Sequence, residues 1–310
     1  MRGHFRVELS GEAVSVGRMG ASGRSPKLSK SPEAADSIPV VVERPISDPR
    51  AAAPDALAAQ IAAVLEEAGA KGRPVHATLG DELVRYFIVT PPGNSAGMQD
   101  LRAATAVRFQ VLYGESASAW DLVADWQAAA PFLACAVPQR ISSALQQAVE
   151  VHHACLVSVI PNFVAAWNRS RRQLSAHTWL AALDERALTL GLVADAARPR
   201  LAAVRTLALP PTPNSMEWLR EHVARAALLD DLPAPSVLHI HGTQLDAWQG
   251  RAASTGNTGN TSNTSNTSNT SSTSNTGMTV RWCAPGNALP GPYGSRQSAA
   301  ARLAARGAAA

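Results

Sequence analysis

Near the start of the chain, the sequence reads Phe5-Arg6-Val7-Glu8-Leu9-Ser10-Gly11-Glu12-Ala13-Val14-Ser15-Val16. Apolar and polar residues alternate on both sides of the Ser10-Gly11 pair, which is the period of a strand with one buried face. Two such runs that are joined by a short turn predict a β-hairpin. We therefore expect the first two strands of a sheet at this end of the chain.

Helices and strands alternate through the chain beyond this hairpin. Apolar residues recur at helical spacing in the ranges 54–68, 98–112, 139–152, 161–172 and 214–229. Short β-rich runs separate these helices, at 38–43, 75–79, 83–89, 120–126, 132–137, 155–160, 177–183, 187–193, 200–207 and 237–241. This alternation predicts an α/β protein with mixed sheets that are flanked by helices.

The chain of 310 residues is long enough for one large domain or two smaller ones. We expect two subdomains, of which the first covers 1–160 and the second is formed by 161–253 together with 278–285. Three further segments are expected to have little packing of their own: a mobile loop at 17–37, a disordered Thr/Ser/Asn repeat at 254–277 and a flexible tail at 286–310. The repeat is thus predicted to be an insertion before a last edge strand.

Composition and charge exclude several classes of protein. A net charge of +4, with arginines scattered along the chain, does not predict a nucleic-acid partner. The three cysteines, Cys135, Cys155 and Cys283, are widely spaced and odd in number, which favours free thiols in a reducing compartment. We find no apolar run of membrane-spanning length and no secretory signal. The expected location is therefore the cytoplasm.

One candidate for catalysis is Gly93-Asn94-Ser95-Ala96-Gly97, which fits the G-x-S-x-G pattern of serine hydrolases. This segment lies between a predicted strand and a predicted helix, as a nucleophile elbow does. Pro91-Pro92, however, separates the strand from the turn, so the strand does not run straight into the serine. Candidates for the base follow in the sequence, at His152, His153, His177, His222, His239 and His241. A hydrolase that uses Ser95 is kept as an alternative function.

Two other motifs predict no ligand. His239 and His241 are spaced to lie on one strand face, but no second ligand pair follows at metal-site spacing. The glycine-rich stretch at 17–25 fails the spacing of a Walker phosphate loop, and Arg24 stands where that loop has lysine. No metal site is therefore predicted.

The order of the predicted elements, together with five segments, resembles a known family. The segments are Phe5–Val16, Val75–Val89, Ala106–Gly114, Ala134–Val137 and Val159–Asn168. They are similar to the actin-like subunits of bacterial type IV pilus and type II secretion machines, which are the PilM-type and GspL-type proteins. The resemblance spans about residues 5–250 and implies an actin-like (ribonuclease H-like) fold of two subdomains.

In active members of the actin-like class, two Asp-x-Gly turns and a glycine pair hold ATP and its metal. The resemblance places the first turn at Ser10 and Gly11, where the aspartate is missing, and the second at Asp184, where Arg186 replaces the glycine. Backbone approaches a phosphate closely only where a side chain is absent. Gly242 stands alone at the third position. We therefore predict the remnant of a nucleotide site and no cofactor, with weak binding of ATP and Mg as the alternative.

This resemblance implies a function in protein assembly rather than in catalysis. We expect a non-catalytic cytoplasmic scaffold that docks an inner-membrane component of a pilus or secretion machine in a groove between its subdomains. The alternatives are the serine hydrolase and a residual ATP-binding module.

Overall fold

The computed structural model describes residues 3–19, 40–93, 97–195, 200–210, 215–243, 245, 248 and 278–283. The predicted repeat at 254–277 and the predicted tail at 286–310 lie outside the described residues, as does most of the predicted loop at 17–37. The second strand continues through Met19, so it contains the first three residues of that predicted loop. None of the described helices is both long enough and apolar enough to cross a membrane.

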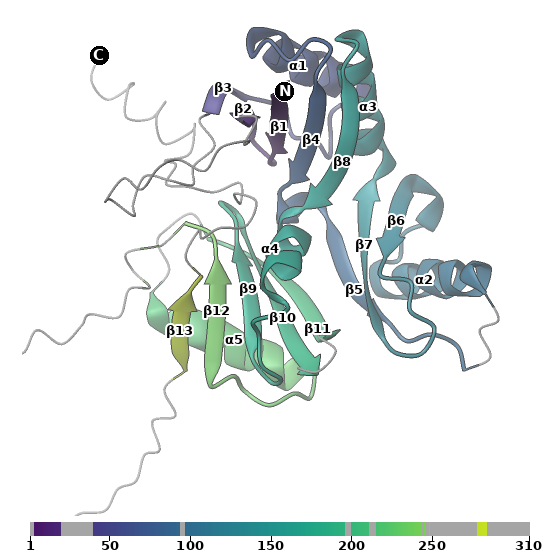
Figure 1. The fold of residues 1–310 in the computed structure, drawn as a ribbon. Coiled ribbons are helices and arrows are strands. Elements are labelled where there is room, and N and C mark those ends of the chain that lie inside the picture. Colours follow the sequence, from purple (N-terminus) through teal and green to yellow (C-terminus); the bar gives the residue numbers. More distant parts are fainter. Residues whose placement is uncertain are drawn as a thin grey trace, which may run out of the picture.

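The first large sheet has the strand order β3-β2-β1-β4-β8 (Figure 1). Its strands are β1 (His4–Leu9), β2 (Ala13–Met19), β3 (Val40–Pro45), β4 (Pro74–Leu79) and β8 (Cys155–Pro161). The predicted hairpin is present as β1 and β2, which pair antiparallel, and β3 joins β2 in the same way. The strands β4 and β8 run parallel to β1. Helices α1 (Pro54–Glu67) and α3 (Gln139–Val151) lie side by side against this sheet.

The second large sheet repeats this order as β11-β10-β9-β12-β13. Its strands are β9 (Trp179–Leu183), β10 (Ala187–Asp195), β11 (Arg200–Ala208), β12 (Val237–His241) and β13 (Thr279–Trp282). Again the first three strands in the sequence pair antiparallel, and the last two run parallel to the first of them. Helix α5 (Met216–Leu229) covers one face, and the Ser215 hydroxyl caps it by accepting from the Trp218 amide.

This duplicated strand order is that of two ribonuclease H-like units in tandem, which confirms the predicted actin-like fold. The two units share packing at their junction. Helix α4 (Asn162–Ser170) follows β8 and leads toward β9, and its buried Phe163 belongs to one hydrophobic cluster with Leu180 and Val193 of the second sheet. A Cβ atom at Gly191 would lie 2.6 Å from the Phe163 ring, so glycine is needed there for this contact.

A smaller unit is inserted between β4 and β8 of the first large sheet. Its three antiparallel strands have the order β5-β7-β6, with β5 at Arg85–Val89, β7 at Phe132–Pro138 and β6 at Trp120–Ala124. Helix α2 (Met98–Tyr113) packs on it through Phe109. The helix ends as predicted at Gly114, whose φ of +68° suits glycine. All three cysteines of the chain are free.

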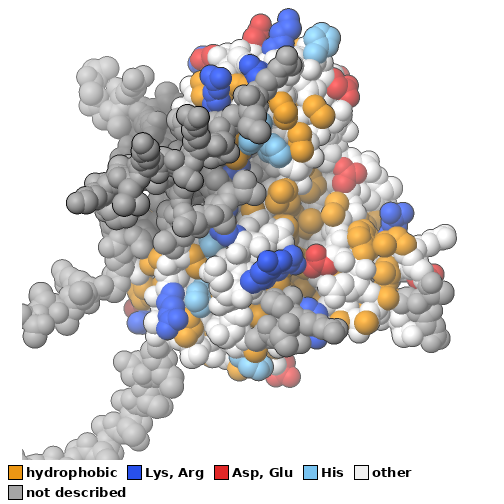
Figure 2. All heavy atoms as spheres, in the orientation of Figure 1, with side chains coloured by type: hydrophobic (Ala, Val, Ile, Leu, Met, Phe, Trp, Pro, Cys, Tyr) orange, Lys and Arg blue, Asp and Glu red, His pale blue; other side chains and the backbone are white. Residues whose placement is uncertain are grey.

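Apolar side chains are visible on the face of the molecule drawn in Figure 2, over β8 and over the small inserted unit. On β8, the exposed side chains include Val157 and Ile160, and on β6 Val123 is exposed. Both strands lie at the edge of their sheets.

Candidate functional site

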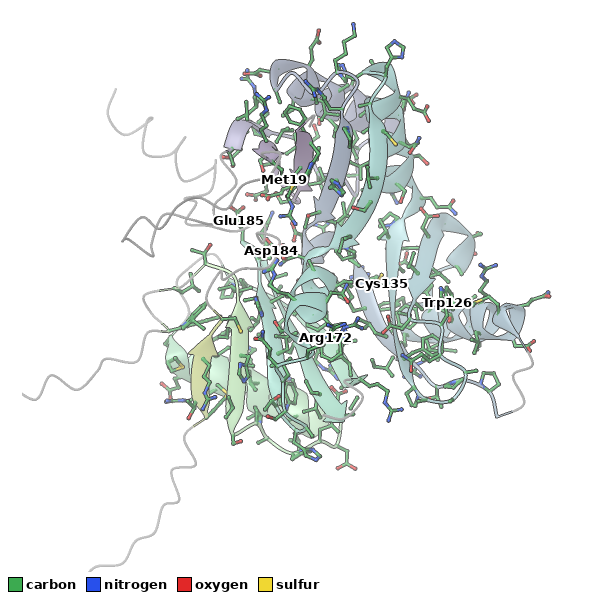
Figure 3. All side chains as sticks on the ribbon, in the orientation of Figure 1. Met19, Trp126, Cys135, Arg172, Asp184 and Glu185 are labelled. Atoms are coloured by element: carbon green, nitrogen blue, oxygen red, sulfur yellow. The ribbon has the colours of Figure 1, made fainter. Side chains whose placement is uncertain are left out.

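Two hairpin turns, one from each large sheet, meet between the two units. The first joins β1 to β2 at Ser10–Glu12, and the second joins β9 to β10 at Asp184–Arg186. An ion pair links them, with 2.6 Å between Arg186 Nη1 and Glu12 Oε1. Figure 3 shows Asp184 at the end of the second sheet that faces the first. The turns that the resemblance assigns to the nucleotide therefore contact each other directly.

The backbone amide of Gly11 is occupied by a side chain of the protein. It donates a hydrogen bond to Glu82 Oε1 at 2.6 Å. Glu82 belongs to a short 3-10 turn, Asp81–Leu83, which follows β4 and brings the carboxyl group to the tip of the first hairpin. A Cβ atom at Gly80 would lie 2.6 Å from Glu82 Oε2, so the space for this carboxyl group exists because residue 80 is glycine.

Asp81 is the most enclosed acid of the site, with an exposed fraction of 0%. Its Oδ1 accepts hydrogen bonds from the Tyr86 hydroxyl at 2.5 Å and from the Phe163 amide at 2.8 Å. Phe163 lies in the first turn of α4, where backbone amides carry a partial positive charge. A buried aspartate thus ties the turn after β4 to the helix that leads into the second unit.

Asp184 completes the contact from the second unit. Its Oδ2 accepts from the Asp81 amide at 3.0 Å, and its Oδ1 accepts from the Glu185 amide at 2.7 Å. Asp184 is only 4% exposed. The carboxyl group that the resemblance assigns to metal or phosphate is therefore hydrogen-bonded to backbone, and one of these bonds crosses between the two units.

The carboxyl groups of Asp81, Glu82 and Asp184 lie close together in a buried site, and this changes the pKa values of Asp81 and Glu82. Burial, reinforced by the charge of Asp184, raises the pKa of Asp81 to about 7. The same two causes raise the pKa of Glu82 to about 8. A side-chain hydrogen bond between Glu82 and Asp184 also raises the pKa of Glu82, because two carboxyl groups can share a hydrogen bond only if one of them is protonated. Near neutral pH the site therefore holds protons that isolated carboxylates would have lost.

The sequence-predicted residues of the first turn are brought to this site. Gly11 donates its amide to Glu82, while the Ser10 hydroxyl bonds within its own hairpin, to the Ala13 amide and carbonyl. Gly242, predicted for the third position, lies directly after β12 with a φ of +133°. A Cβ atom there would lie 2.4 Å from the Leu183 carbonyl oxygen. The protein's own backbone thus fills the space beside Gly242.

Asp81 and Glu82 are not among the predicted site residues, because in the sequence they lie in the break between two β-rich runs. The signal that could have found them is their position at the end of β4, a strand that is the parallel neighbour of β1. The carboxyl-terminal ends of neighbouring parallel strands lie at the same edge of the sheet, so the residues that follow these strands can contact each other. Two acids directly after Gly80 at this edge are therefore candidates for contact with the Ser10–Glu12 turn.

The hydrolase candidate Ser95 lies outside the described residues. Among the histidines proposed as its base, His152 Nε2 contacts the Ala62 carbonyl at 2.8 Å, and His222 stacks on Trp218. His241 contacts the Ser170 hydroxyl, and burial lowers the pKa of His241 to about 4. These histidines therefore have partners that belong to the packing of the fold.

A metal ion would need several acidic, histidine or cysteine side chains that converge on one point. Within the ranges that the structure describes, no group of three or more His, Cys, Asp and Glu side chains is arranged to hold a metal ion. His239 and His241 lie on β12, as predicted. Mg²⁺ remains part of the alternative prediction of a residual ATP site.

No protein-family model matches the chain, and no curated protein matches it. Among solved structures, it is similar to the cytoplasmic domain of EpsL, an inner membrane component of the type II secretion system of Vibrio cholerae. The identity is 10% and the TM-score 0.46, over 77% of this chain and 82% of that one. A Bacteroides thetaiotaomicron protein with an actin-like ATPase fold and unknown function has 9% identity and a TM-score of 0.49, over 79% and 83% of the two chains. The PilM-PilN type IV pilus biogenesis complex has 16% identity and a TM-score of 0.45, over 72% and 65%. These are likenesses of fold, and the assignment of the actin-like fold rests on the strand order of the two sheets.

Proposed function

We propose that this chain is a non-catalytic actin-like subunit that acts as a scaffold for a protein partner in a pilus or secretion machine. The proposal that the chain is not catalytic rests on one observation, the hydrogen bond from the Gly11 amide to Glu82 Oε1. An amide at this turn can hold a phosphate only if no group of the protein already accepts its hydrogen bond. Glu82 is such a group.

The charge of the site supports the same proposal. A triphosphate brought to the two turns would meet the carboxyl groups of Asp81, Glu82 and Asp184 in place of cations, and any of these groups that is ionised would repel it strongly in a region of low dielectric. Arg186, which belongs to the second turn, is paired with Glu12. Binding of ATP would therefore require the loss of contacts between the two units.

The type of partner rests on the resemblance in the sequence, which is to subunits that hold inner-membrane components of pilus and secretion machines. Chemical crosslinking in the cells that make this protein, followed by mass spectrometry, is expected to identify such a component. Recovery of no such component by crosslinks from either unit would contradict the scaffold function.

The loss of catalysis is tested with nucleotide. A ligand that binds only the folded state raises its stability, so thermal unfolding with millimolar ATP and Mg²⁺ reports binding. We expect the same midpoint with and without ATP. A rise with ATP, or hydrolysis that is abolished by Asp184→Asn, would instead support the residual ATP-binding module.

A further inference from the structure

Helix α2 of the small inserted unit has apolar residues on two opposite faces. One face packs against the small sheet through the buried ring of Phe109. On the outward face, Ala103, Val107 and Val111 follow each other at intervals of four residues and therefore lie in one row, which we call the outer stripe. All three are exposed, Val107 at 62% and Val111 at 71%, and Figure 1 shows α2 at the periphery of the molecule. A surface helix ordinarily has polar side chains on its outward face, so the outer stripe indicates an interaction surface.

Two side chains of opposite charge lie beside the outer stripe and do not meet within one chain. Asp100 and Arg108 are eight residues apart, which is about 12 Å along the helix. Asp100 accepts a hydrogen bond from the Gly97 amide at 3.1 Å and so belongs to the N-terminal cap of α2. Arg108 is exposed and forms no ion pair with any residue that the structure describes. An occupant of the stripe should therefore bring a cation to Asp100 and an acid to Arg108.

A second copy of α2 that runs antiparallel to the first has both groups in the required places. A twofold axis beside Ala104 puts Asp100 of each copy opposite Arg108 of the other, because the two residues are equally far from the axis. Helical spacing places Gln99 and Gln110 on the opposite side of the stripe. The same axis brings these two amides together across the pair, where they can exchange hydrogen bonds. The polar groups on both sides of the stripe are thus complementary to themselves.

The apolar residues of the outer stripe fit this arrangement. Ala103 lies next to the axis, where its small side chain lets the two helix axes approach to about 8 Å, the short end of the usual range. Val107 then packs over Ala103 of the partner subunit. Val111 reaches the start of the partner's α2, where Gly97 has no side chain. The stripe of each copy is therefore covered along its length by the stripe of the other.

Segments of this chain outside the described residues do not match the outer stripe. Residues 20–39 are divided by Pro26, Pro32 and Pro39 into stretches of at most six residues, which are too short for a helix along the stripe. Residues 249–277 contain no apolar residue larger than alanine, and residues 284–310 contain no acid for Arg108. Every other gap in the described ranges has four residues or fewer. The second copy is the occupant whose charges match on both sides.

We propose that two copies of this chain associate through α2 in an antiparallel, twofold-symmetric pair that is centred beside Ala104. The contact of two four-turn helices is smaller than a standard interface of about 1,600 Å², so the association is weak, with a dissociation constant on the order of 10–100 µM. This inference does not depend on the proposed scaffold function. In a scaffold, the pair would present two copies of each partner site.

A disulfide placed on the outer stripe tests the register. The variants are made in a chain with Cys155→Ser and Cys283→Ser, which removes the two native thiols that are not buried. The two copies of residue 103 lie about 3 Å apart along the helices, so Ala103→Cys is expected to form an intermolecular disulfide under mild oxidation. The two copies of residue 111 lie about 20 Å apart, so the matched variant Val111→Cys is expected to remain unlinked. The reverse result would contradict the antiparallel pair.

Sedimentation equilibrium of the full chain tests the charges, at concentrations from about 10 to about 200 µM, which bracket the expected constant. Arg108→Glu is expected to weaken the dimer about fivefold or more, because it places two acids opposite each other on both sides of the axis. The matched control is Arg102→Glu on the same helix, whose guanidinium lies 5.9 Å from the centre of the Trp126 ring, away from the stripe. It is expected to change the affinity by less than about twofold. Adding Asp100→Arg to Arg108→Glu restores opposite charges and should recover the dimer.

Two outcomes would overturn the inference. One is a chain that stays monomeric at about 200 µM and forms no disulfide through Ala103→Cys. The other is a dimer that Arg108→Glu and Arg102→Glu weaken equally, which would assign the association to another surface or to net charge. In both cases, crosslinks to an inner-membrane component without any effect of ATP leave the scaffold function standing.

Discussion

The carboxyl group of Glu82 lies against the backbone amide of Gly11, with 2.6 Å between Oε1 and the nitrogen. Glu82 follows the fourth strand and Gly11 lies between the first two, so this hydrogen bond closes the sheet edge at which an actin-like protein would hold phosphate. Glu12, the next residue of the same turn, reaches across to Arg186 of the second unit. The contact between the two units therefore uses the turns that the resemblance assigns to a nucleotide.

The stability of the protein is expected to fall as the pH rises from about 5 to 8. Asp81 and Glu82 have raised pKa values in the folded state, about 7 and about 8, so the folded protein holds protons that the unfolded chain has released. A group of this kind contributes stability that is present at low pH and is lost as the pH passes through its folded pKa. The free energy of unfolding, measured in urea at pH 5 and pH 8, should differ by a few kcal/mol, on the order expected for such shifts.

The substitution Glu82→Gln tests the origin of this pH dependence. Glutamine keeps an acceptor for the Gly11 amide but cannot ionise, so the difference in stability between pH 5 and pH 8 should become smaller. Glu66→Gln on the exposed face of α1 is the control and should leave the difference unchanged. An equal pH dependence in the wild type and in Glu82→Gln would show that Glu82 does not carry the effect.

Tyr86→Phe is expected to destabilise the protein by about 1–3 kcal/mol, since it removes a hydrogen bond to a buried carboxyl group. The cost should be larger at pH 8 than at pH 5, because the ionised form of Asp81 depends most on this hydroxyl. Tyr113→Phe is the matched control, since its hydroxyl donates to the neutral Tyr86 carbonyl at 2.9 Å. Its cost should not depend on pH over the same range.

The first hairpin and the alternation of strands and helices follow from patterns that are visible in the sequence. The alternation around Ser10-Gly11 predicts the first hairpin because one face of that hairpin is buried, as the structure shows for Val7, Leu9, Val14 and Val16. Predicted boundaries fail where a local backbone conformation breaks a favourable pattern. The run that was predicted as a strand to Trp126 ends at Ala124, and Trp126 has a φ of +47°.

The site was predicted only in part. Gly11, Asp184 and Gly242 could be placed because the resemblance assigns positions to them. Asp81 and Glu82 could not, because their roles depend on contacts that are distant in the sequence, such as Glu82 with Gly11 and Asp81 with the Phe163 amide. A hydrogen bond between residues so far apart in the chain has no signature in the local sequence. Glu82 and Gly11 come together only because β4 pairs beside β1 in the sheet.

Gly242→Ala is expected to be strongly destabilising, by about 3 kcal/mol or more, because a new Cβ atom would lie 2.4 Å from the Leu183 carbonyl oxygen. Gly69→Ala is the matched control: its φ is also positive, +73°, but nothing lies within 4 Å of the new atom. That change should cost about 1–2 kcal/mol, the cost of a left-handed conformation alone. Urea unfolding of the two variants measures the difference, and equal costs would contradict the close packing at Gly242.

Arg186→Gly tests which group closes the nucleotide position. The substitution provides the glycine that active actin-like proteins have in the second turn, and it removes the ion pair with Glu12. If the arginine alone blocked the site, ATP with Mg²⁺ would raise the unfolding temperature of this variant. We expect no rise, because Glu82 still accepts from the Gly11 amide and the buried carboxyl groups remain.

The double variant Arg186→Gly, Glu82→Gly frees that amide, and an ATP-dependent rise that appears only there would identify Glu82 as the group that occupies the phosphate position. A rise in Arg186→Gly alone would assign this role to the arginine.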